Sequence, residues 1–297
     1  MSPTRATLLA CLLALLAGPA RCQQTDLGRA AARALAGRRG SIVVLDVASG
    51  RVLAAERLDL AGRPVRPGST LKPLVLLELL HSGKLDSRER LVCSRRLRIG
   101  TLRFDCSHVR EVSELDLDDA LAYSCNSYIA QVAARFEPSQ LVEALRRAGL
   151  DSPTGLANDE ARGRIDLPQD PDALKLAALG ARGVEVTPLE LVEAYRKLAL
   201  RKRSGEDPLA RPVFEGLEHA VAYGTAHASS VEGMHSAGKT GTAAGPGPER
   251  HGLFAGYAPA GRPEVAVVVY LAGGRGYDAA AAARPVFEAY LRERSAQ

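Results

Sequence analysis

The chain has 297 residues, of which 46% are hydrophobic and 25% are charged. This size and composition suit one large domain or two interleaved lobes, and we expect no second enzyme or long linker beside it. The formal net charge is only +5, the chain has no Trp, and no basic stretch alternates with aromatic residues. The sequence therefore argues against nucleic acid as a partner.

The first residues have the pattern of an export signal. Met1–Arg5 is a short basic start, Ala6–Ala17 is rich in Leu and Ala, and small residues follow it. An apolar run of about 12 residues is shorter than the ~20 that span a bilayer. We therefore predict a signal peptide over residues 1–22 and export to the periplasm or another extracytoplasmic site. Lipidation at Cys22 and association with the outer face of the cytoplasmic membrane stay open.

A β-hairpin and a long apolar helix are predicted next. Two strand-like runs flank a Ser-Gly turn, so we expect a hairpin over Ser41–Glu56. Ser69–His81 is strongly apolar and ends near Gly83, which predicts a central, buried helix. Ser69 would then lie at the positive end of the helix dipole.

This helix opens with Ser69-Thr70-Leu71-Lys72, which places a hydroxyl and an amine on one face, because three residues are about one helical turn. A serine hydroxyl is a poor nucleophile until a base takes its proton. Lysine can act as that base once burial lowers its pKa, whereas arginine cannot lose its proton. Taken alone the string is weak, because serine also caps helices and lysine also lies on their surfaces.

Cys93 and Cys106 bracket a short loop that also holds four arginines. In an exported protein a disulfide between them is favoured over a metal site, because neither a Cys-x-x-Cys string nor converging histidines accompany them. Cys125 is then expected to be a free, buried thiol away from that loop. The arginines are either a solvated surface or a basic edge that meets an anionic wall polymer or a membrane surface. They are Arg95, Arg96, Arg98 and Arg103.

The middle of the chain, from about 111 to 201, has a helical pattern. Its clearest segments are Leu115–Phe136, Pro138–Ala148 and Pro188–Leu200. Ser124-Cys125-Asn126 is expected between helices or at their edges, where polar side chains can project into a cleft.

Strand signals return in the last part of the chain. They cover Ser236–Ala243, Gly252–Tyr257 and Glu264–Leu271, and an amphipathic helix over Asp278–Arg294 follows them. The first of these strands contains Lys239-Thr240-Gly241-Thr242, and a hairpin connection is expected at 245–248.

Strands near both chain ends, with helices between them, predict an α+β fold. One antiparallel sheet would be assembled from distant segments and flanked by helices, with an inserted all-helical lobe. We expect a single domain over residues 23–297, with an α/β lobe at about 38–80 and 230–297 and a helical lobe at about 81–229.

The three strings around Ser69, Ser124 and Lys239 occur in an order that resembles the penicillin-binding transpeptidase family, whose serine acyltransferases share a fold with serine β-lactamases. The similarity also includes Gly224-Thr225-Ala226 and Phe254–Pro259, and it covers nearly all of the chain after the signal. It implies the penicillin-binding transpeptidase, β-lactamase-like fold.

The resemblance implies a role for each motif residue. Ser69 would attack the carbonyl between two terminal D-alanines of a peptidoglycan stem peptide, Lys72 would act as general base, and Ser124 would relay the proton. Asn126 would hold the substrate amide, and Lys239 with the hydroxyls of Thr240 and Thr242 would bind the terminal carboxylate. Gly241 would belong to the same substrate-binding strand. The acyl-enzyme would pass to an amine of a neighbouring stem and so cross-link the cell wall, and β-lactams would acylate the same serine.

No cofactor is implied, and the expected partners are stem peptides, β-lactam antibiotics and other cell-wall synthesis proteins. A serine β-lactamase is the nearest rival, but Glu160 in the candidate loop lacks the Leu-Asn pair that normally accompanies its deacylation base. A D,D-carboxypeptidase stays open, because the sequence does not show which acceptor reaches the acyl-enzyme. A β-lactam sensor is disfavoured because it normally needs membrane segments to transmit its signal, and the sequence shows none. A non-catalytic scaffold is disfavoured because Ser69 and Lys72 are both present.

Overall fold

The computed structural model describes residues 25–245 and 249–296. The predicted signal peptide and most of the predicted connection at 245–248 lie outside the described residues. Within the described ranges, no helix combines the length and the apolar character that a membrane span requires.

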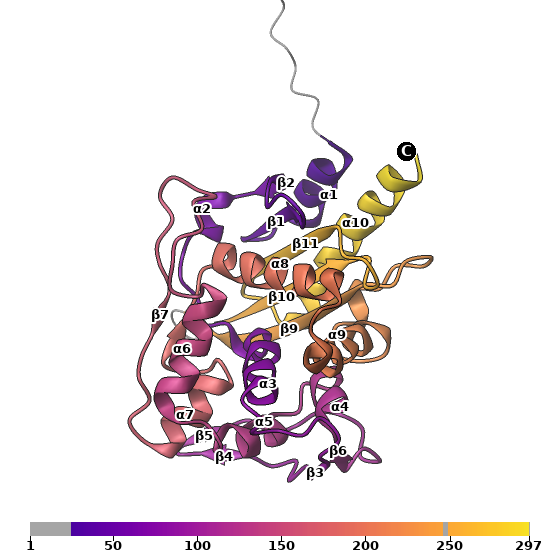
Figure 1. The fold of residues 1–297 in the computed structure, drawn as a ribbon. Helices are drawn as coiled ribbons and strands as arrows, with labels where there is room; N and C mark the ends of the chain where they lie inside the picture. The colour runs from indigo at the N-terminus through magenta and orange to yellow at the C-terminus, as the bar shows by residue number, and fades with distance from the viewer. Residues whose placement is uncertain (1–24, 246–248, 297) are drawn as a thin grey trace, which may run out of the picture.

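A five-stranded sheet forms the centre of the fold, in the order β2-β1-β11-β10-β9 (Figure 1). All of its neighbouring strands are antiparallel. The N-terminal hairpin therefore adds to a C-terminal meander, as the sequence predicted. The strands are β1 (Gly40–Asp46), β2 (Val52–Glu56), β9 (Ala237–Ala244), β10 (Arg250–Ala258) and β11 (Val265–Ala272).

Helices cover both faces of this sheet. Helix α8 (Pro188–Ser204) packs against β11 on one face, and α1 (Asp26–Ala34) and α10 (Gly276–Ser295) pack together on the other (Figure 1). Successive strand residues point to opposite faces, so Val43 joins the core beneath α8 whereas Val44 joins the core beneath α10. Burial on both faces explains why β1 reads as a continuous apolar run.

The remaining helices gather beside the sheet, and three short strand pairs connect them (Figure 1). Helix α6 has the predicted bounds. The helices are α2 (Leu58–Ala61), α3 (Lys72–His81), α4 (Leu117–Ala122), α5 (Asn126–Ala133), α6 (Pro138–Ala148), α7 (Pro171–Ala178) and α9 (Arg211–Ala222). The strand pairs are β3 (Leu91–Val92) with β6 (Glu114–Leu115), β4 (Arg98–Ile99) with β5 (Leu102–Arg103), and β7 (Arg164–Ile165) with β8 (Val184–Glu185).

The prediction of one helix over Leu115–Phe136 is wrong, because the chain forms α4 and α5 with a sharp break between them. Ser124 has a φ of 56°, in the left-handed region that a helix cannot include. Cys125 then caps α5, since its Sγ accepts a hydrogen bond from the backbone N–H of Tyr128. The break places the second motif in a turn between two helices.

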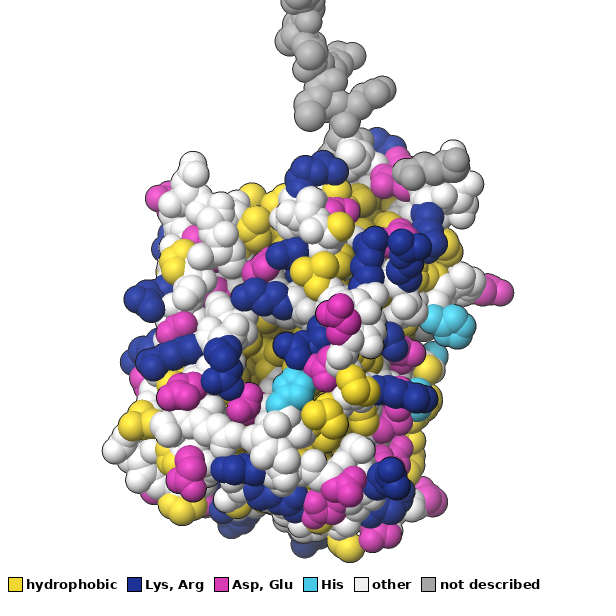
Figure 2. Space-filling model, viewed as in Figure 1, with side chains coloured by type: hydrophobic (Ala, Val, Ile, Leu, Met, Phe, Trp, Pro, Cys, Tyr) yellow, Lys and Arg dark blue, Asp and Glu magenta, His cyan; other side chains and the backbone are white. Residues whose placement is uncertain are grey.

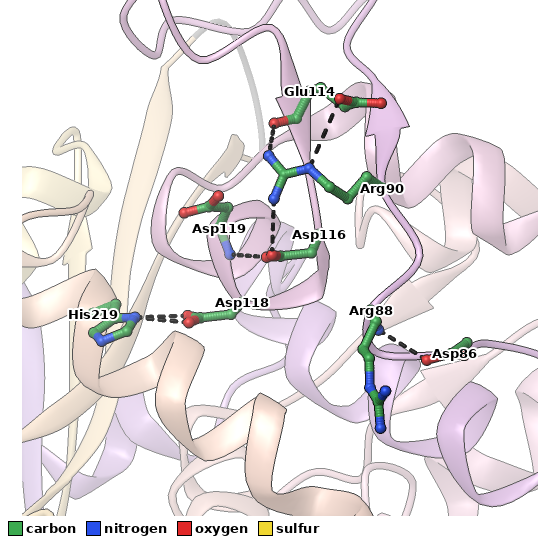
Figure 3. Close-up of polar contacts among 8 residues, drawn as sticks. All are labelled: Asp86, Arg88, Arg90, Glu114, Asp116, Asp118, Asp119 and His219. Atoms are coloured by element: carbon green, nitrogen blue, oxygen red, sulfur yellow. Dashed lines mark hydrogen bonds and ion pairs between the residues drawn. The ribbon is translucent and has the colours of Figure 1, made fainter.

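A charged cluster holds the N-terminal end of α4 in place (Figure 3). The Arg90 guanidinium donates to the Glu114 carbonyl oxygen at 2.8 Å and to Asp116 Oδ2 at 3.3 Å. Asp118 lies 2.8 Å from Nδ1 of His219, which belongs to α9. Helix α4 is therefore tied to β6 and α9, which fixes the start of the turn that carries Ser124.

The face of the molecule in Figure 2 carries basic and acidic side chains in alternation. No continuous basic band crosses it, so the electrostatic potential on this face changes sign over short distances.

Candidate active site

Ser69 lies in a 3-10 turn (Gly68–Leu71) that leads directly into α3. The turn is tied to the neighbouring loop because the Gly68 N–H donates to the Gly180 carbonyl oxygen at 3.0 Å. Gly68 has a φ of 54°, and a Cβ on it would lie 3.0 Å from the carbonyl oxygen of Thr242. The absence of a side chain here brings the turn up against β9.

Gly241 serves the same close approach from the β9 side. A Cβ at Gly241 would lie 2.5 Å from the Pro67 carbonyl oxygen, which is a steric clash, so only glycine fits here. The resemblance placed Gly241 in the substrate-binding strand. The close packing against Pro67 also explains why a glycine is required at this position. The first and third motifs are thereby in backbone contact.

Lys72 connects the first motif to the second. Its fully buried Nζ donates to the Ser124 carbonyl oxygen at 2.8 Å, to Asn126 Oδ1 at 2.7 Å and to Ser124 Oγ at 3.2 Å. No hydrogen bond joins Nζ to Ser69 Oγ among the described residues. Burial lowers the pKa of Lys72 to about 8. A substantial fraction of this amine is therefore neutral at mildly alkaline pH.

Ser124 and Asn126 are held by the strained turn between α4 and α5. The positive φ of Ser124 carries a steric cost that a surrounding structure must offset, and such residues concentrate at functional sites. Both polar atoms of the Asn126 side chain have a partner, because Oδ1 accepts from Lys72 while Nδ2 donates to the Phe104 carbonyl oxygen at 3.1 Å. One Nδ2 N–H and one Oδ1 lone pair remain for a substrate amide.

Lys239 is the second fully buried lysine at the site. Its Nζ donates to the Thr240 carbonyl oxygen at 3.2 Å and lies 3.4 Å from Thr225 Oγ1. Burial, to which the charge of Lys72 adds, holds the pKa of Lys239 well below its usual value. Thr225 carried no assigned role in the sequence analysis, although its Gly-Thr-Ala string was part of the resemblance.

Thr242 is exposed at the end of the third motif. Its Oγ1 accepts a hydrogen bond from the Gly276 N–H at 2.9 Å, which leaves the hydroxyl proton free to be donated. A cavity of about 370 Å³ is lined by Ser69, Asn126 and Thr242 together. The structure thus brings all three motifs to one cavity, which is of a size usual for ligand sites.

The three described cysteines are free thiols that lie together. Cys125 Sγ is 3.5 Å from Cys93 Sγ and 3.7 Å from Cys106 Sγ. The expectation that Cys125 lies away from the loop is therefore wrong. A disulfide requires an S–S distance of ~2.05 Å, so no bridge is formed here and the Cys93–Cys106 pairing stays a prediction.

His108 also lies against these thiols, although no spacing in the sequence predicts it. Its ligand atom and the three sulfurs all lie within 4.8 Å of one another. The His108 ring is buried, and its Nε2 has no hydrogen-bond partner. A tetrahedral zinc ion with Zn–S bonds of ~2.3 Å would separate its sulfurs by roughly 3.8 Å, close to the two distances above. The donor set and spacing therefore fit a zinc ion.

The local hydrogen bonds at the cluster also suit thiolates. The backbone N–H groups of Arg95 and Tyr128 point at the sulfurs of Cys93 and Cys125, at 3.3 and 3.4 Å. A hydrogen bond from Cys125, with backbone N–H groups adding to it, lowers the pKa of Cys106 to about 5. Without a metal the other two thiols stay protonated, because burial raises the pKa of Cys93, and the hydrogen bond to Cys106 together with burial raises that of Cys125. Metal ligation requires deprotonated sulfur, so these donors favour it.

Glu160 is not placed as a deacylation base. Its Oε2 accepts from the Thr154 N–H at 2.9 Å, the Thr154 hydroxyl at 2.8 Å and the Gly155 N–H at 3.1 Å. It does not line the cavity at Ser69. Its carboxylate instead stabilises its own loop, which removes the main support for the β-lactamase alternative.

The chain was compared with known proteins. The family model described as "Penicillin binding protein transpeptidase domain" matches residues 40–292. Among curated proteins, the chain is 29% identical over 302 residues to peptidoglycan D,D-transpeptidase FtsI of Escherichia coli (strain K12), a match covering 85% of this chain and 50% of that protein. It is 25% identical over 363 residues to peptidoglycan D,D-transpeptidase MrdA of Acinetobacter baumannii, covering 89% and 52%. The chain thus spans about half the length of these relatives.

Two solved structures share the fold. The D,D-transpeptidase domain of a peptidoglycan glycosyltransferase from Eggerthella lenta superposes with a TM-score of 0.79 at 23% identity, covering 92% of this chain and 82% of that one. Pseudomonas aeruginosa PBP2, solved in complex with WCK 5153, gives a TM-score of 0.77 at 24% identity, covering 90% and 74%. These similarities confirm the predicted fold class.

Proposed function

Because the chain belongs to the penicillin-binding-protein transpeptidase family, we propose that it is a serine D,D-transpeptidase that cross-links peptidoglycan stem peptides through an acyl-enzyme at Ser69. The observation that carries the proposal is the meeting of three motifs at one cavity, lined by Ser69, Asn126 and Thr242. Fold alone would not suffice, because one fold can host several activities.

Acylation begins with a proton transfer from Ser69 Oγ to the neutral amine of Lys72. The hydroxyl oxygen attacks the carbonyl between two D-alanines, and the backbone N–H groups of Ser69 and Thr242 stabilise the oxyanion, each donor contributing about 10²- to 10³-fold in rate. The C–N bond then breaks, and the departing amine takes a proton from Lys72 through Ser124. Ser124 Oγ suits this relay because it lies 3.2 Å from Lys72 Nζ and a hydroxyl both donates and accepts.

Lys72 also shows why deprotonation changes this network. A protonated amine has three N–H donors, and the structure supplies three acceptors. A neutral amine has two donors and one lone pair, so one contact must reverse or be released. The Ser124 hydroxyl can reverse by donating to Nζ, whereas the Ser124 carbonyl and Asn126 Oδ1 cannot.

Lys239, Thr240 and Thr242 bind the terminal carboxylate of the substrate in this proposal. An incoming carboxylate raises the pKa of the buried Lys239 and restores its charge, since an opposite charge favours the ionised form. The completed acyl-enzyme passes to an amine of a neighbouring stem peptide. β-Lactams, which also carry a carboxylate beside a reactive carbonyl, acylate the same serine.

A fluorescent penicillin tests this function. The mature protein is expected to form a covalent adduct that persists for many minutes after unbound label is removed. An adduct lost within seconds would identify a β-lactamase. Release of D-alanine from a pentapeptide without incorporation of an added amine acceptor would identify a carboxypeptidase, and the absence of any adduct on folded protein would contradict the proposal.

We further propose an extracytoplasmic location, consistent with the cell-wall activity named for the relatives and with the predicted signal at residues 1–22. Association with the outer face of the cytoplasmic membrane and with other cell-wall synthesis proteins belongs to the same proposal. So does the division of residues 23–297 into an α/β lobe (about 38–80 and 230–297) and a helical lobe (about 81–229).

We propose that one structural zinc ion binds the cluster formed by Cys93, Cys106, His108 and Cys125. Four protein ligands leave no open position, so the metal's chemistry is to fix the fold rather than to activate water. Cys125 lies between Ser124 and Asn126, so the zinc ion would hold the second motif against the loop that carries Phe104. That would steady the two side chains that contact Lys72.

We expect about one zinc ion per purified chain by elemental mass spectrometry. His108→Gln should lower the zinc content several-fold, whereas His227→Gln should not, because His227 is exposed and its ring lies against the Val221 carbonyl oxygen. Peptide mapping after non-reducing alkylation tests the alternative, a disulfide in place of the zinc ion. A metal-free protein with Cys93 joined to Cys106 would establish the predicted disulfide instead.

A further inference from the structure

Arginines surround the cavity at Ser69. Its described lining residues include four arginines and no Asp or Glu, and the arginines are Arg66, Arg103, Arg182 and Arg250. Lys239, which the proposal assigns to the terminal carboxylate, is a fully buried residue of β9 and does not line this cavity. The cavity therefore carries more positive charge than recognition of a terminal carboxylate requires.

Two of these arginines form no ion pair within the described part of the chain. Arg103 forms an ion pair with Asp105, and Arg66 also lines a neighbouring cavity that includes Glu185. Arg182 and Arg250 are exposed, and neither forms an ion pair with any of the described residues. Unpaired guanidinium groups on a cleft wall are suited to bind anions, since they present a planar set of donors that match a carboxylate.

The sheet register places Arg250 along the path of a bound peptide. Arg250 pairs with Ala244, two residues beyond Thr242 on β9 and on the side away from Lys239. Two strand residues span ~6.6 Å, so a peptide held at Thr242 and extended along β9 would reach Arg250 about two residues from the acylated carbonyl. Arg182 follows α7 and reaches the cavity from a separate segment.

We infer that Arg182 and Arg250 determine substrate charge: the site selects an acidic stem peptide, with a free carboxylate on a residue preceding the D-alanines, over the same peptide with that carboxylate amidated. This inference rests on the proposed transpeptidase function. Fixed charges of one sign on low-dielectric walls raise the local concentration of the opposite charge and favour its productive binding. Amidation removes that charge and leaves the guanidinium groups without a partner.

Two β-lactams that differ by one carboxylate provide the test. Benzylpenicillin and its α-carboxy derivative carbenicillin are compared by their second-order acylation rate constants, expressed as the ratio of carbenicillin to benzylpenicillin. Arg182→Gln and Arg250→Gln should each lower this ratio by about 2- to 5-fold, the range of exposed charge pairs, and the double variant should lower it further. Added salt should lower the wild-type ratio and leave that of the double variant nearly constant.

Arg284→Gln is the matched control, because Arg284 lies on α10 beyond the sheet and pairs with Glu288. It should leave the ratio unchanged. An unchanged ratio in the double variant, or an equal fall in the control, would overturn the inference while leaving the proposed function intact.

If neither penicillin acylates the wild type, the proposed function fails first. The charge inference is then decided by equilibrium binding of two synthetic peptides ending in D-Ala-D-Ala, one acidic and one amidated, to wild type and double variant. Equal binding of the two peptides to the wild type would overturn it, and tighter binding of the acidic peptide that is lost in the double variant would support it.

Discussion

Ser69→Ala is expected to abolish the covalent penicillin adduct. The adduct is an ester of Ser69 Oγ, and alanine has no atom that can form it. Removing a nucleophile that works together with its base typically lowers turnover by about 10⁶-fold, so residual reaction should fall below detection. Intact-mass spectrometry after incubation with penicillin measures the adduct directly, and the variant should show only the mass of the unmodified chain.

Ser82→Ala is the matched control for this variant. Ser82 lies just after the same helix, where its hydroxyl donates to the Glu78 carbonyl oxygen at 2.8 Å, remote from the cavity. It should acylate at the wild-type rate. The nucleophile assignment would be wrong if an adduct formed on folded Ser69→Ala, or if wild type and Ser82→Ala both remained unmodified.

The sequence predicted the sheet and most of the site because their signals are local. Lys239 and Thr242 lie in a strand that is followed by a Gly- and Pro-rich connection in the chain, and Ser69 precedes an apolar run that predicts a buried helix. The order of the three motifs then suggested that they meet. Their meeting itself depends on backbone approaches at Gly68 and Gly241, which no local pattern specifies.

The expectation that Ser124-Cys125-Asn126 lies between helices is confirmed, but the backbone conformation of this break could not be predicted, because its chemistry is unusual. Helices normally end at glycine and begin after Ser, Thr, Asp or Asn. Here Ser124 takes the positive φ and Cys125 provides the cap, and neither residue type is usual for its position. The positive φ at Ser124, adjacent to the Lys72 contacts, is the kind of local exception expected at a functional site.

The cysteine cluster was missed for a different reason. Its ligands come from the loop at Cys93, the Cys106–His108 segment and the N-terminus of α5. Because these segments are far apart in the sequence, their spacing does not match a known metal-binding motif. A single residue separates Cys106 from His108, and the resulting Cys-x-His pair is a weak signal alone. Only the packing of α5 against this loop brings Cys125 to the other ligands.

Lys72→Arg is the second variant with a large expected effect. Arginine keeps the positive charge but cannot accept the Ser69 proton at any accessible pH, so the variant separates a general base from a counter-ion. General-base catalysis contributes typically 10²- to 10⁴-fold, and acylation should fall by about that factor. Stopped-flow or gel measurements of the second-order acylation rate constant test this, with Lys197→Arg on α8 as the matched control because Lys197 is exposed and donates only to Ala148.

The pH dependence distinguishes loss of a base from simple misfolding. In the wild type the pKa of Lys72 is lowered to about 8, so the amine is mostly protonated and inactive as a base below that pH and mostly neutral above it. The acylation rate constant should therefore rise with pH through about 8 and then level off. Lys72→Arg should show a low rate without this rise, even where its circular dichroism spectrum matches that of the wild type.

Arginine is larger than lysine, and overpacking a fully buried position costs about 1 to 3 kcal/mol, so a second variant is needed. Lys72→Met has a similar length and volume to lysine but no titratable group, and it should lose acylation to the same extent. If either folded variant kept a near-normal rate, or kept the rise at pH 8, another group would be the base. Ser124 would be the first to examine, because its hydroxyl is the neighbour of Lys72 that can both donate and accept a proton.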